Sequence, residues 1–86
     1  MQPVPPFWFQ QRQAKMEPAR TNTFRLTAPN QGEAFIFIER ADNGHWSAGL
    51  KTAADGPVVT TSGPIWESEE DAWASAFELY RNEVVV

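Results

Sequence analysis

The segment Ala34 to Ile38 reads Ala-Phe-Ile-Phe-Ile and is apolar at every position. Side chains of a β-strand alternate between the two faces of a sheet, so Phe35 and Phe37 share one face. The other face carries Ala34, Ile36 and Ile38. A strand that is apolar on both faces lies inside a sheet that is covered on both sides. Any fold for this chain must therefore supply two covers for this central strand.

Short strands separated by turn residues flank this segment. Thr23 to Ala28 alternates polar and apolar residues, which predicts a strand with one buried face. The sequence Asp42-Asn43-Gly44 tolerates positive φ and predicts a hairpin. No connection is long enough for a crossover helix, so we expect antiparallel pairing throughout. The predicted strands span residues 23–28, 34–40, 45–51 and 58–62.

A helix is predicted after Ser68, whose hydroxyl suits the N-cap position. Glu69, Glu70 and Asp71 follow, and carboxylates in the first turn complement the helix dipole. Large apolar residues then recur at helical spacing, which predicts a helix face that covers one side of the sheet. These residues are Trp73, Phe77, Tyr80 and Val84, with Ala72, Ala76 and Leu79 beside them. The predicted fold class is α+β, with an antiparallel meander of three to four strands packed against one C-terminal helix.

Residues 1–20 have the composition of an N-terminal Pro-rich arm, with four prolines among several glutamines. The prolines also permit a short helix through Lys15, with Pro18 beyond its end. The chain has 86 residues, a length that supports only one hydrophobic core. We therefore expect an arm over residues 1–20 and a single domain over residues 21–86.

Charge is distributed unevenly along the chain. The arm holds three basic residues and one acidic residue, a net charge of 3 − 1 = +2, and the rest holds four basic and ten acidic residues, 4 − 10 = −6. An acidic domain gains nothing from counterion release on a phosphate backbone, so nucleic-acid binding is disfavoured. The chain has no cysteine, no signal-peptide pattern and no apolar run that would span a membrane, and we expect a cytoplasmic protein.

The sequence predicts no enzyme. His45 is the only histidine, and its place after an Asn-Gly turn predicts a surface side chain rather than a general base. The one dense acidic group, Glu67 to Asp71, lacks calcium-loop spacing and is explained by the helix dipole. No Gly-rich phosphate loop precedes the helix. We therefore predict no catalytic residue, no metal ligand and no cofactor.

The region from residue 46 to residue 76 resembles the unit of the YegP-like small bacterial proteins. That unit has an aromatic strand, Leu-Lys, a Gly turn, a β-branched strand, Ser, an aromatic residue and a helix. The turn here is longer than in that family. The resemblance implies a sheet with one packed helix and no established activity. The matching residues are Trp46, Leu50, Lys51, Gly56, Val58, Val59, Ser62, Trp66 and Ala72.

The second apolar face of the central strand suggests a function. One helix covers one face of a sheet, so Phe35 and Phe37 require another cover, which the arm or a second subunit would supply. The candidate interaction surface is therefore Phe7, Trp8, Phe9, Phe35 and Phe37. We expect a small non-enzymatic interaction module that self-associates, as a homodimer, through the sheet surface, the sheet edge or the arm, or that binds an unidentified protein partner.

Two alternatives involve nucleic acid or its binding proteins. Four strands and a helix in a dimer are also the arrangement of PC4-like single-stranded nucleic-acid binders, in which Trp46, Phe35 and Phe37 would stack on bases. Arg25, Arg40 and Lys51 would contact phosphates. In the other alternative, an acidic inhibitor occupies the groove of a nucleic-acid-binding partner through Glu67 to Asp71.

Overall fold

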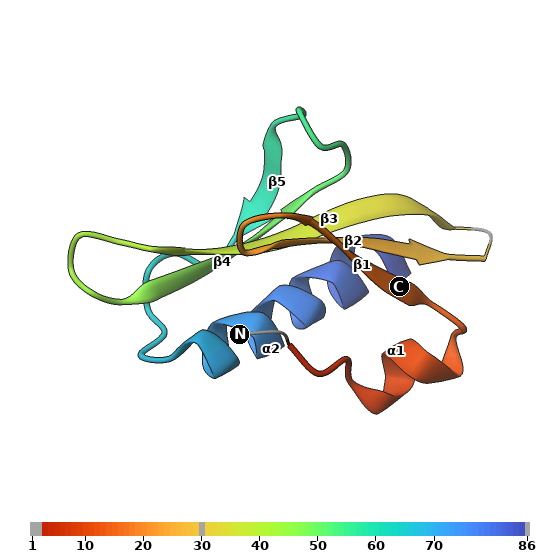
Figure 1. Cartoon of the computed structure of the whole chain (residues 1–86), viewed down its shortest axis with the longest axis horizontal. Helices are drawn as coiled ribbons and strands as arrows, with labels where there is room; N and C mark the ends of the chain where they lie inside the picture. Colours follow the sequence, from red (N-terminus) through yellow and green to blue (C-terminus); the bar gives the residue numbers. More distant parts are fainter. Residues whose placement is uncertain (1–2, 30, 86) are drawn as a thin grey trace.

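The structure is a computed structural model that describes residues 3–29 and 31–85. Five antiparallel strands form one sheet in the order β1-β2-β3-β4-β5, and α2 packs across one face of it (Figure 1). The predicted α+β class, with an antiparallel meander and a C-terminal helix, is confirmed. The elements are α1 (Phe7–Gln11), β1 (Lys15–Arg20), β2 (Thr23–Ala28), β3 (Gln31–Arg40), β4 (Trp46–Lys51), β5 (Val58–Thr61), α2 (Glu69–Tyr80) and a π-helical turn (Arg81–Val85).

The sheet has one strand more than the three to four that the sequence predicted. The additional strand, β1, comes from the segment that we interpreted as an arm, and it pairs with β2. A two-residue turn makes this possible, because Arg20 pairs with Thr23 and Asn22 adopts a φ of 53°, which asparagine tolerates. Pro18 is accommodated because β1 lies at the edge of the sheet, where a missing N–H breaks no ladder. The domain therefore includes residues on both sides of position 20.

The remainder of the N-terminal segment folds against α2, on the same side of the sheet (Figure 1). Phe9 is buried, and its ring centroid lies 5.4 Å from that of Phe77 in an edge-to-face arrangement. The α1 helix ends at Gln11, earlier than the predicted end at Lys15, because Gln13 adopts a φ of 58° and turns the chain into β1. This segment is part of the core.

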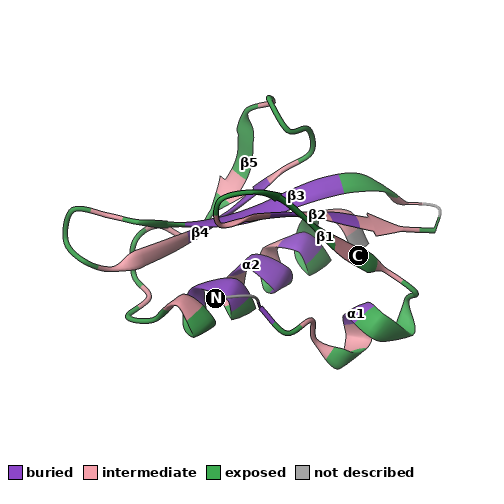
Figure 2. Ribbon diagram, in the orientation of Figure 1, coloured by how far each residue is buried: buried purple, intermediate pink, exposed green. Residues whose placement is uncertain are grey.

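The core lies between α2 and the inner face of the sheet, which is the face toward α2 (Figure 2). Ser68 caps α2 as predicted, since its Oγ accepts a hydrogen bond from the Asp71 N–H at 3.1 Å. Trp73 packs edge-to-face on Phe24 of β2 at 5.2 Å. The other buried members of the core are Phe9, Leu26, Ala34, Ile36, Ile38, Ala48, Leu50, Ala72, Ala76, Phe77 and Tyr80.

The turns agree with the sequence where the structure describes them. Gly44, between β3 and β4, has a φ of 85°, as a hairpin after Asp42-Asn43 requires. The β3 strand begins at Gln31, three residues earlier than predicted, and Asn30 in the preceding turn lies outside the described residues. Among the described helices, none has the length and apolar character to cross a membrane.

Candidate interaction surfaces

The five residues of the predicted interaction surface lie in two places. Phe7, Trp8 and Phe9 belong to α1, on the α2 side of the sheet, whereas Phe35 and Phe37 point to the outer face, the face away from α2. Phe9, Phe35 and Phe37 are buried, Trp8 is half-buried and stacks on Tyr80, and Phe7 is 73% exposed. The structure therefore does not bring the two groups together, and only Phe7 presents a largely exposed ring.

The outer face of β3 is covered by the chain itself. The connection between β4 and β5 stands on this face of the sheet (Figure 1). The Phe37 ring lies over Gly49 of β4, so close that a Cβ on Gly49 would lie 2.2 Å from Phe37 Cζ. Lys51 Nζ lies 5.3 Å from the centroid of the same ring. Phe37 is only 9% exposed as a result, and it needs no second subunit to shield it.

Phe35 is covered in a similar way, at the end of the sheet where β1 meets the β4–β5 connection. A recess of about 30 Å³ beside it is lined by Arg20, Lys51 and Ala54, among others. The Arg20 Nη2 atom lies 2.9 Å from Asp55 Oδ1, and this exposed ion pair joins the end of β1 to the connection. Phe35 is 6% exposed. The Phe7–Phe9 part of the predicted arm packs against α2 instead, so the cover of Phe35 comes from Arg20, at the end of that arm, and from the β4–β5 connection.

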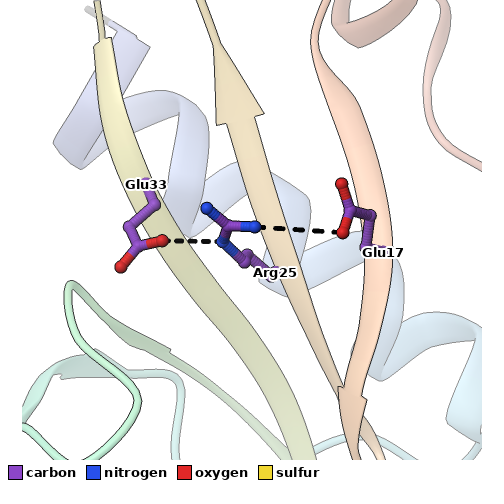
Figure 3. A network of polar contacts seen from close by, with 3 residues as sticks. All are labelled: Glu17, Arg25 and Glu33. Atoms are coloured by element: carbon purple, nitrogen blue, oxygen red, sulfur yellow. Dashed lines mark hydrogen bonds and ion pairs between the residues drawn. The ribbon is translucent and has the colours of Figure 1, made fainter.

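The charged side chains of the outer face are paired with each other. Arg25 of β2 lies between two carboxylates from the neighbouring strands (Figure 3). Its Nε donates to Glu33 Oε2 at 2.6 Å, and its Nη1 lies 3.8 Å from Glu17 Oε2. Arg25 therefore faces an acidic environment. With Phe35 and Phe37 buried as well, the outer face does not have the stacking platform that a PC4-like binder uses.

The residues considered for catalysis do not assemble into a site. Of the described residues, no Asp, Glu, Lys, Arg or His is fully buried, and no three of the types His, Cys, Asp or Glu gather where they would hold a metal ion. His45 is half-buried, and its backbone N–H donates to Asn43 Oδ1 at 2.9 Å in a turn. Ser62 accepts a hydrogen bond from Trp66 Nε1 at 3.0 Å. Both residues serve the local structure of the β3–β4 and β5–α2 connections.

Among the described residues, Tyr80 is the most buried ionisable group. Its side chain is 0% exposed, and its hydroxyl forms no hydrogen bond with the described residues. Burial disfavours the charged phenolate, so it raises the pKa of Tyr80 above the ordinary value of 10.0. Its neighbours are Phe9 and Trp8 of α1, which makes it a structural residue at the junction between the two helices.

The two edges of the sheet differ in chemistry. At one edge, β1 presents exposed Lys15, Glu17, Pro18 and Arg20, and charges and proline protect an edge strand from pairing with another chain. At the other edge, β5 is Val-Val-Thr-Thr, carries no charge and is β-branched throughout. Val58 and Val59 are each 48% exposed. No backbone hydrogen bond joins β5 to a described segment other than β4. The β5 edge is therefore free.

A groove of about 280 Å³ lies between the N-terminal segment and α2. One wall comes from Pro3, Val4 and Pro6, and the other from residues 70–78 of α2. The sequence predicted the helix face that covers the sheet but not this groove, because the groove depends on where the segment before α1 lies. The one indication of it in the sequence was the group of prolines near the N-terminus, because proline fixes φ and keeps the segment that forms this wall extended. The lining residues of α2 are Glu70, Trp73, Ala74, Phe77 and Glu78.

No family model, curated protein or solved structure matches the chain. The resemblance of residues 46–76 to the YegP-like unit therefore stays a prediction. Two free surfaces, the β5 edge and the groove beside α2, remain as the candidates for function.

Proposed function

We propose that this protein is a small non-enzymatic interaction module that self-associates, as a homodimer, through the free edge of β5. The observation that carries the proposal is the contrast between the two edges, of which only β5 lacks charge and proline. A cytoplasmic location remains part of the proposal and is supported by the cysteine-free sequence.

The other routes to self-association lose their support. The sheet surface is occupied by the chain's own β4–β5 connection, and Phe35 and Phe37 lie beneath it. The arm contributes β1 and the buried Phe9, so a swapped arm would first have to give up contacts that the chain already makes within itself, and it would regain only the same contacts between two chains. The β5 edge is free without any such loss.

The chemistry of β5 suits a second copy of the chain. Two copies of one strand pair antiparallel about a two-fold axis, and each then presents the same surface to the other. Val58 and Val59 would lose exposed apolar surface in this contact. With four residues in β5, the contact is small, so we expect weak association. Each chain carries a net charge of −4, so salt should tighten the dimer by screening repulsion.

Sedimentation velocity over about 10 μM to about 1 mM protein tests the proposal, because weak dimers form in this range. We expect the wild type to shift toward dimer with concentration and Val59→Lys to remain monomeric, since an edge lysine opposes strand pairing. Gln11→Lys, which adds the same charge on exposed α1, is the matched control and should behave as the wild type. A wild type that stays monomeric at every concentration, or a Val59→Lys variant that dimerises equally, would refute the proposal.

A further inference from the structure

The groove beside α2 is built from one stripe of the helix. Its lining residues on α2 follow the spacing i, i+3, i+4, i+7, i+8, which places them on one face. Trp73 and Phe77 are 2% exposed each and form the floor, whereas Ala74 is exposed. This face differs from the one that the sequence predicted to cover the sheet, although the two share the large aromatic residues.

The opposite wall is rigid and apolar. Pro3 is buried and Pro6 is half-buried, so the segment is anchored at both ends of the wall. Proline fixes φ, which means that little backbone freedom would be lost on binding. Val4, between these prolines, is 85% exposed, and Phe7 lies just beyond. Large apolar side chains left in water at a groove are typical of a binding surface.

The size of the groove limits its occupant. About 280 Å³ lies below the range of about 300–1,000 Å³ in which drug-sized ligands bind. A side chain or a short peptide segment fits such a space better than a cofactor does. The exposed Val4 on its wall would extend the contact to the rest of a peptide.

The carboxylates on the lining of the groove favour a positively charged occupant. Glu70 and Glu78 lie on its lining, and neither forms an ion pair with a described residue. They are eight residues apart, or about 12 Å along the helix axis. The helix holds four carboxylates, Glu69, Glu70, Asp71 and Glu78, and no basic residue. A nucleic acid, an anionic lipid surface and a second copy of this acidic chain are each disfavoured there.

We infer that the groove between Pro3–Pro6 and α2 is a docking site for a basic segment of a partner protein. The aliphatic part of a lysine or arginine side chain lies against the aromatic floor, and its cation reaches Glu70 or Glu78. Lysine and arginine suit this arrangement because their stems are apolar and their ends are charged. In an extended segment, two basic residues four positions apart span about 13 Å, which matches the separation of the two glutamates.

The test uses a fluorescein-labelled peptide of sequence Gly-Lys-Leu-Ser-Leu-Lys-Gly and fluorescence anisotropy with the full chain at low salt. We expect saturable binding in the range of about 10 μM to about 1 mM, weakening as salt is added. The same peptide with glutamate in place of lysine should not bind. This salt dependence is opposite to that of the β5 dimer, so the two contacts are distinguished in one protein sample.

Two variants locate the binding. Glu70→Gln with Glu78→Gln should weaken binding about tenfold, whereas Glu67→Gln with Glu83→Gln makes the same charge change elsewhere and should change it less than about twofold. Ala74→Gln keeps the charge but fills the exposed part of the groove, and it should weaken binding as well. All five replaced side chains are exposed, and the buried floor is left intact, so we expect folding to be preserved.

Several results would overturn the inference. The first is no binding of the lysine peptide at about 1 mM protein, because the dissociation constant would then lie above the expected range. Equal weakening by both glutamine pairs is another, since it would indicate attraction to the net charge of the chain. If Ala74→Gln binds as the wild type does, the peptide lies outside the groove.

Discussion

Gly49→Ala tests how the outer face of the sheet is closed. The added methyl group would lie 2.2 Å from Phe37 Cζ and 2.6 Å and 2.8 Å from the two Cε atoms of the same ring. The ring must therefore leave its place over β4. Lys51 lies above it and limits outward movement. The substitution is thus expected to destabilise the domain, although alanine normally suits a strand better than glycine does.

The expected magnitude follows from two opposing effects. Inserting a carbon into a packed site costs about 1–3 kcal/mol. The gain from replacing glycine by alanine in a strand is about 0.5–1 kcal/mol, because the unfolded chain loses conformational freedom. The two effects differ by about 1 kcal/mol at the centres of their ranges, so we expect the free energy of unfolding to fall by about 1 kcal/mol. For a domain of this size, the melting temperature should fall by about 4–8 °C.

The assay is urea unfolding followed by tryptophan fluorescence, with Gly32→Ala as the matched control. Gly32 also lies in a strand and has no positive φ, and a Cβ added to it meets nothing within 4 Å. We expect that control to be as stable as the wild type or slightly more stable. Combining Gly49→Ala with Phe37→Leu should recover part of the loss, because the shorter side chain leaves room. Equal stability of the two alanine variants would refute this account of the outer face.

Three further predictions concern the helix side of the sheet. Phe9→Ala should lower the free energy of unfolding by about 3–5 kcal/mol, whereas Phe7→Ala should change it by less than about 0.5 kcal/mol. Both values are measured by calorimetry. If the two variants are equally stable, the N-terminal segment is a free arm and not part of the core. Trp73→Ala should cost about 3–5 kcal/mol by the same measurement, and an unchanged melting temperature would show that Trp73 lies at the surface. Tyr80 is the only tyrosine, so the tyrosinate absorbance reports its pKa directly, and it should exceed 10.0 in the folded protein. Because the pKa of Tyr80 is higher in the folded state, its contribution to the free energy of unfolding is fully present below pH 10.0 and is lost as the pH rises through the folded pKa. Tyr80→Phe should therefore reduce the loss of stability at alkaline pH. An unchanged loss would assign it to other groups.

Local patterns identified most of the fold. The period-two strands, the turn before Gly44 and the spacing of Trp73, Phe77 and Tyr80 each depend on neighbouring residues alone, and the structure confirms them. The first strand was missed because β1 is an edge strand. Its exposed charges and Pro18 remove the apolar alternation that identifies a strand. The signal that remained was Asn22, a residue that tolerates positive φ and directly precedes the next predicted strand.

The candidate site could not be predicted to the same extent, because it depends on contacts between distant segments. The groove joins Pro3–Pro6 to α2, about 70 residues away in sequence, and no periodicity within either segment specifies that contact. The free edge of β5 was predictable only in part. Its β-branched composition indicated a strand, and its place as the last strand of the predicted meander put it at an edge. The contrast with the opposite edge was not predicted, because the charges and proline there belong to β1.

The covering of Phe35 and Phe37 shows why an apolar face in a sequence does not by itself predict a second subunit. Two phenylalanine side chains in the middle of a strand require only a small cover, and glycine, alanine and the stem of a lysine are sufficient when the ring lies flat. Such residues carry no hydrophobic pattern of their own, so the cover cannot be identified from periodicity. A need for a partner therefore follows from surface that remains exposed after the chain has folded. By that criterion, a partner would gain most at the exposed large apolar side chains, which among the described residues are Val4, Phe7, Ile65 and the β5 valines Val58 and Val59.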